Sequence, residues 1–131
     1  MVLAVTLIAQ ERGRSVWDGV YSREQAGRGR LEYDRRCAEC HGDEMEGDVV
    51  EHPELAGGNF RDKWNGETLA ELFERIHRDM PQKNPGTLSR AVTIDLIAFI
   101  LQENHYPPGD RGLPQDTPSL KLIRIESNRA R

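Results

Sequence analysis

Two cysteines lie three positions apart, and a histidine directly follows the second one, in the run Cys37-Ala38-Glu39-Cys40-His41. Two thiols on one turn of helix can each form a thioether with one of the two vinyl groups of a protoporphyrin, and the imidazole that follows can bind the iron. These are the only two cysteines, so a four-sulfur zinc site is excluded, and a short-loop disulfide or a chance match is the alternative. The run therefore predicts one haem c, attached through Cys37 and Cys40, with His41 as an iron ligand.

The second axial ligand decides what such a haem does. Haem with His and Met carries electrons at a raised potential, whereas haem with an open position binds gases or activates peroxide. Met1 is terminal, and Met45 is only four residues after His41, too close in sequence to reach the other face of the macrocycle easily. Met80 precedes Pro81, which favours extended backbone at residue 80. We predict Met80 as the second ligand, and a methionine that fills the core is the alternative.

Three further histidines, His52, His77 and His105, are rival ligands that would give a bis-histidine haem of lower potential. His77 is the strongest rival because it lies three residues from Met80. We predict a structural role for all three.

The first predicted helix leads into the haem motif. Ser22 and Gln25 have the spacing of a capping box, in which each side chain bonds the backbone of the other residue. After the motif, glycine and proline breakers predict a long polar loop over residues 42–65.

Two more helices are predicted in the second half of the chain. Apolar residues at i, i+3, i+4 and i+7 predict an amphipathic helix within residues 67–78. Ser89 is a candidate cap for a last helix that is apolar nearly all round, as buried helices are, and Asn104 with the prolines after it ends that helix.

Composition and length indicate one domain of 131 residues. Aromatic residues are few (2 Trp, 3 Tyr, 3 Phe), so a haem would supply the missing apolar bulk. The formal net charge of −4 argues against nucleic acid as a partner. Five acids follow the haem motif with no base among them: Asp43, Glu44, Glu46, Asp48 and Glu51. They predict a negative rim beside the haem that attracts a basic partner, or merely a solvated loop.

The two ends of the chain differ from its middle. Residues 1–9 are apolar and too few to span a bilayer, and we interpret them as the remnant of an export signal. A short N-terminal core strand is the alternative. The haem domain is then expected over residues 10–110, followed by a C-terminal extension over 111–131. Haem attachment in bacteria takes place outside the cytoplasmic membrane, so we expect a periplasmic or otherwise exported protein with no stable transmembrane segment in the mature chain.

The order of helix, C-x-x-C-H, loop, helix, Met-Pro loop and last helix over residues 22–109 resembles the class I cytochromes c. Gly29 and Tyr33 precede Cys37 by eight and four positions, as the family's glycine and aromatic do, and Phe99 matches the aromatic of the last helix. The resemblance implies an all-α, cytochrome c-like fold of three or more helices around one covalent haem, with Gly29 where the first and last helices cross.

The resemblance also implies roles for Pro53 and Trp64. Residues 53–57 are similar to the family's P-x-L-x-G loop, whose proline carbonyl accepts a hydrogen bond from Nδ1 of the proximal histidine. Trp64 is similar in position to the tryptophan that donates to a haem propionate. The alternatives are a simple turn residue at Pro53 and an ordinary packing aromatic at Trp64.

Short segments, among them 17–21 and 104–109, resemble bacterial cytochromes associated with periplasmic quinoprotein dehydrogenases. We therefore expect a one-electron carrier rather than an enzyme, working between redox proteins such as a quinoprotein dehydrogenase and a terminal oxidase. Two alternatives stay open: a haem peroxidase or gas-binding protein with a labile distal ligand, and a fixed electron-entry subunit of a larger dehydrogenase complex.

Overall fold

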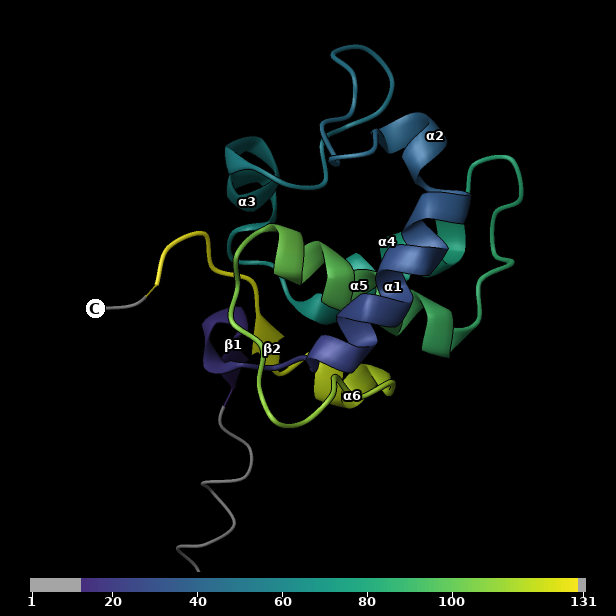
Figure 1. Ribbon diagram of the computed structural model, residues 1–131. Coiled ribbons are helices and arrows are strands. Elements are labelled where there is room, and N and C mark those ends of the chain that lie inside the picture. Colours follow the sequence, from purple (N-terminus) through teal and green to yellow (C-terminus); the bar gives the residue numbers. More distant parts are fainter. Residues whose placement is uncertain (1–12, 130–131) are drawn as a thin grey trace, which may run out of the picture.

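The computed structural model describes residues 13–129, so the predicted export-signal remnant lies outside the described residues. Helices form the body of this part (Figure 1). They are the 3-10 helix η2 (Val16–Asp18) and the α-helices α1 (Arg23–Arg36), α2 (Ala38–His41), α3 (Gly58–Trp64), α4 (Leu69–Asp79), α5 (Arg90–Glu103) and α6 (Thr117–Leu120). The all-α prediction is confirmed, and among the described residues no helix is long and apolar enough to cross a bilayer.

Helices α1 and α5 cross at the centre of the molecule (Figure 1). Gly29 lies at the crossing, where a Cβ would overlap the backbone carbonyl of Asp95, so only glycine permits this approach. One turn further on, the ring centroids of Tyr33 and Phe99 are 5.5 Å apart. Arg28 reaches across with two hydrogen bonds to the Asp95 carboxylate, at 2.9 and 3.1 Å. The crossing that the resemblance implied is confirmed.

The predicted helix starts are confirmed by their caps. The Ser22 hydroxyl accepts from the Gln25 N–H, and the Gln25 side chain accepts from the Ser22 N–H, both at 3.2 Å. The Ser89 hydroxyl accepts from the Val92 N–H at 3.1 Å at the start of α5. These local bonds satisfy backbone donors that a helix leaves without partners in its first turn, which is why they can be predicted from sequence.

The prediction of a loop throughout residues 42–65 is wrong in its last part, where α3 forms. Its start is stabilised by the Glu54 carboxylate, which accepts from the Phe60 N–H at 3.2 Å. Phe60 itself is buried in the core. A seven-residue helix is marginal alone, so its formation depends on this tertiary packing rather than on local propensity.

The two ends of the described chain form a clasp on the body, made of residues 13–18 and 113–126 (Figure 1). Strand β1 (Arg14–Ser15) pairs in parallel with β2 (Ile123–Arg124). Four apolar side chains of the second segment are at most 4% exposed: Leu113, Leu120, Ile123 and Ile125. The predicted C-terminal extension thus contributes to the same hydrophobic core as the rest of the chain.

Candidate haem site

A cavity of about 400 Å³ opens between α2, the loop after it, α4 and the segment after α4. Part of its wall is apolar, formed by Leu55, Leu72, Ile76, Leu96 and Ile100. All six candidate site residues line the same cavity: Cys37, Cys40, His41, Pro53, Trp64 and Met80. The fold therefore brings together side chains that span 44 positions of the sequence, from 37 to 80, around one apolar space.

The turn between α1 and α2 carries both thiols and the imidazole. Helix α1 ends before Cys37, whose backbone (φ −123°, ψ −35°) departs from helical geometry. The Cys37 carbonyl then accepts from the N–H groups of Cys40 and His41, at 3.2 and 2.9 Å. The first helix thus leads into the motif across a break at Cys37 rather than as one continuous helix. Burial raises the pKa of the Cys37 thiol to about 11, and the two cysteines form no disulfide.

The proximal loop orients His41. The ring is buried, and its Nδ1 lies 2.9 Å from the Pro53 carbonyl oxygen. A carbonyl only accepts, so Nδ1 carries the proton and Nε2 keeps its lone pair, the state in which an imidazole can bind a metal. The loop closes back on the same residue, because the Gly47 N–H donates to the His41 carbonyl at 2.6 Å.

Met80 follows directly after α4, in the extended conformation that Pro81 favours (φ −112°, ψ 152°). Its N–H still donates to the Ile76 carbonyl at 3.0 Å, so the helix holds its backbone while the side chain is partly exposed at the cavity. Met45, in contrast, is 1% exposed and belongs to the hydrophobic core.

The other histidines lie in different surroundings. His52 lines the cavity beside His41, with ring centroids 6.2 Å apart, and its Nδ1 lies 2.6 Å from the Asp48 carboxylate. His77 stacks on Phe73 at 5.2 Å between centroids and does not line the cavity.

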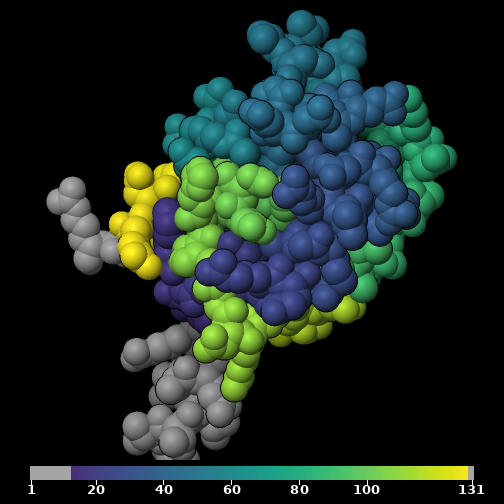
Figure 2. All heavy atoms as spheres, in the orientation of Figure 1, coloured from purple at the N-terminus to yellow at the C-terminus, as the bar shows by residue number. Residues whose placement is uncertain are grey.

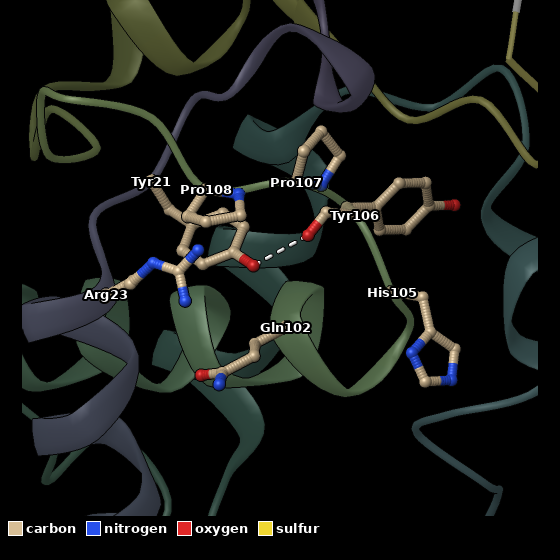
Figure 3. Close-up of a pocket in the computed structure, with 7 residues that line it drawn as sticks. All are labelled: Tyr21, Arg23, Gln102, His105, Tyr106, Pro107 and Pro108. Carbon is tan, nitrogen blue, oxygen red and sulfur yellow. Dashed lines mark hydrogen bonds between the residues drawn. The ribbon is translucent and has the colours of Figure 1, made fainter.

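His105 is exposed beside a second depression of about 270 Å³, between the end of α5 and the start of α1 (Figure 3). The Tyr21 hydroxyl donates there to the Tyr106 carbonyl at 2.7 Å. This bond ties the segment before α1 to the segment after α5, so we assign the depression a structural role.

The rim of the cavity carries both signs of charge: Arg36, Lys63, Arg75 and Lys83 with Glu39, Glu51 and Glu54. Lys83 and Glu39 form an ion pair at 3.4 Å between the Met80 loop and the haem motif. Lys63, next to Trp64, has no carboxylate within 4.0 Å among residues 13–129. Of the five acids from which the sequence predicts a negative rim, only Glu51 lines the cavity. The bases could not be predicted in this way because they come from separate segments.

Residues 24–100 match the family model of cytochrome c oxidase, cbb3-type, subunit III. Among solved structures, the chain is similar to one in the crystal structure of the sulfane dehydrogenase SoxCD from Paracoccus pantotrophus, with 25% sequence identity and a TM-score of 0.57. The similarity covers 83% of this chain but 61% of that one, so it spans less than two thirds of the other chain. No curated protein matches the sequence.

Proposed function

Because the chain belongs to the cytochrome c oxidase, cbb3-type, subunit III family and is a class I c-type cytochrome, we propose that it binds one haem c covalently and passes single electrons between redox proteins. The observation that carries this proposal is the convergence of two thiols, an oriented imidazole and a thioether on one apolar cavity.

The residues around the cavity fit haem c. Cys37 and Cys40 would form the two thioethers, and His41 and Met80 would be the axial ligands. The apolar wall suits a porphyrin face, while Lys63 and the Trp64 indole offer donors for a propionate, which is costly to bury without them. When bound, haem supplies a one-electron couple between ferric and ferrous iron.

The protein residues tune that couple by binding and orientation. The Pro53 carbonyl holds one tautomer of His41, which strengthens the imidazole as a donor. A Met80 thioether on the iron would raise the potential relative to a second imidazole. If His41 and Met80 both bind the iron, they would leave no open position for a gas or peroxide, which favours electron transfer over ligand binding.

We propose an exported or periplasmic protein with redox proteins as partners. The family is described as an oxidase subunit, and the structural match comes from a dehydrogenase. Both descriptions support redox proteins as the general class of partner. A quinoprotein dehydrogenase as donor and a terminal oxidase as acceptor stay predictions. The second candidate, a fixed subunit of a larger complex, is supported by the description of the family as an oxidase subunit.

Mass spectrometry and the ferric optical spectrum together test the proposal. Protein matured in a host that attaches haem should have the mass of the chain plus one haem, keep it through acid–acetone extraction, and leave no thiol for alkylation. Its ferric spectrum should contain the sulfur-to-iron charge-transfer band. Extraction of the haem would reject covalent attachment, and a high-spin ferric spectrum would favour the peroxidase or gas-binding alternative. Size-exclusion chromatography of native extract separates a free carrier from a fixed subunit.

A further inference from the structure

The loop between α2 and α3 carries an exposed apolar tip, formed by Val49 and Val50. Val50 is 90% exposed and Val49 fully so, which makes them the most exposed large apolar side chains among the described residues. The loop projects from the body in the ribbon view and forms the knob at the top of the space-filling view (Figures 1 and 2). Two adjacent valines in water are unfavourable unless something covers them.

The tip is held in a defined shape. One carboxylate oxygen of Asp48 accepts from the backbone N–H groups of Val50, Glu51 and His52, at 2.9, 2.7 and 3.2 Å. The Asp48 N–H in turn donates to the His52 carbonyl at 2.8 Å. The hydrogen bond from the Glu51 N–H is the largest of several that hold the pKa of Asp48 well below its usual range. The turn thus presents both valines outward. Because the loop already has this shape, little conformational entropy is lost when a partner binds it.

The tip is continuous with the candidate haem site. Glu51, His52 and Pro53 follow the valines directly and line the cavity. On its other side, the loop is tied to the His41 carbonyl through the Gly47 N–H. A molecule seated on Val49 and Val50 would therefore lie next to the mouth of the cavity.

The charges around the tip select the kind of molecule. Asp43, Glu44, Glu46 and Glu51 are exposed, and residues 42–52 contain no Lys or Arg. None of these four acids has a basic nitrogen within 4.0 Å in the part of the chain that the structure describes. An apolar tip set in free negative charge is repelled by anionic lipid and by the same loop of a second copy, and it is attracted to a basic surface.

We propose that Val49 and Val50 are the apolar anchor by which this cytochrome docks on a redox partner protein, whose surface has an apolar depression bordered by Lys and Arg. The proposal rests on the proposed electron-transfer function. The acids steer the encounter and set its salt dependence, whereas the valines lengthen the life of the complex. An anchor of two side chains suits the small interfaces of transient redox complexes.

Stopped-flow oxidation of the reduced protein by respiratory membranes of the organism that encodes it tests the anchor. Val49→Ser with Val50→Ser should lower kcat/KM at least about fivefold, mainly through KM, with an unchanged dependence on ionic strength. Asp43→Asn with Glu44→Gln should instead flatten that dependence. The matched control is Leu31→Ser, because Leu31 is 64% exposed on α1 and does not line the cavity. The ferric spectrum and midpoint potential should be the same in all variants.

Equal kinetics in the valine variant and the Leu31→Ser control would overturn the proposal. So would a dimer of the unaltered protein that the valine substitutions dissociate, or co-sedimentation with phosphatidylglycerol vesicles that they abolish, because each assigns the tip another occupant. Failure of the unaltered, haem-bearing protein to be oxidised at all would reject the carrier function and the docking site with it. Normal oxidation with an unaffected valine variant rejects the docking site alone.

Discussion

The crossing of α1 and α5 and the cavity region are completed by different means. At the crossing and the clasp, protein atoms alone cover the core, and many side chains are 0% exposed, among them Ala26, Ile97, Leu101 and Leu120. Around the cavity, His41 is buried, but other lining residues stay partly exposed, among them Cys37, Cys40, Ile76 and Met80. A haem of the proposed kind would add apolar contacts to the walls of the cavity. We therefore predict that the first region is stabilised by the chain alone and the second also by the proposed haem.

The largest effect is expected from Cys37→Ala with Cys40→Ala, which removes both points of haem attachment. The chain should lose haem during purification, and amide hydrogen exchange should become fast in residues 42–57 and 80–88. The slowest exchange should remain where α1 and α5 cross. If amide exchange around the cavity is as slow as in the haem-bearing protein, the contrast between the two regions is wrong, because the cavity region then needs no cofactor.

Met80→Ala should abolish the sulfur-to-iron charge-transfer band and open a site for carbon monoxide. It should also lower the midpoint potential by a sizeable part of the roughly 0.8 V over which axial ligands set haem potentials. His77→Ala is the control, since His77 contacts Phe73 and not the cavity. An intact band in Met80→Ala, or a changed ligation state in His77→Ala, would assign the ligand to another residue.

Gly29→Ala should destabilise the haem-bearing protein by about 3 kcal/mol, near the upper end for an overpacked core, because the new Cβ meets backbone rather than a movable side chain. Gly27, also in α1, has no atom within 4 Å of a Cβ built on it. Gly27→Ala should therefore stabilise by about 0.5–1 kcal/mol. Denaturant unfolding measures the free energy of unfolding of both variants. Changes of the same sign would contradict the close approach of α1 to α5 at Gly29.

Gln25→Ala should destabilise the haem-bearing protein by about 1–2 kcal/mol, because it leaves buried backbone groups of the clasp without hydrogen-bond partners. The Gln25 side-chain amide donates to the Leu113 carbonyl at 3.1 Å and accepts from the Leu113 N–H at 2.7 Å. Gln102→Ala, at an exposed position on α5, is the control for thermal unfolding. If the two variants unfold alike, the clasp does not support the core.

Lys63→Gln should have the smallest effect, a midpoint potential about 10–40 mV lower, equivalent to the roughly 0.2–1 kcal/mol of an exposed ion pair. The sign follows because loss of a positive charge near the iron favours the ferric state. Lys121→Gln, beside β2 and away from the cavity, should leave the potential unchanged. Propionate modes in the resonance Raman spectrum should shift only in Lys63→Gln, and identical spectra would remove Lys63 from the site.

The sequence by itself determined the features that depend on local chemistry. The spacing of Cys37, Cys40 and His41 predicts haem attachment because all three sit on one turn, and the caps at Ser22 and Ser89 mark helix starts because each bond spans three residues. The extended backbone of Met80 follows from the ring of Pro81 alone.

Only the tertiary structure decided what depends on distant partners. Helix α3 forms because Phe60 enters the core. The last described segment belongs to the body because Leu113 bonds Gln25, 88 positions away, and β2 pairs with β1, more than 100 positions away. The mixed charge of the cavity rim arises where several separate segments meet. Such contacts leave no periodic or local signal, since the free energy that stabilises them comes from burial against residues that the sequence alone does not place nearby.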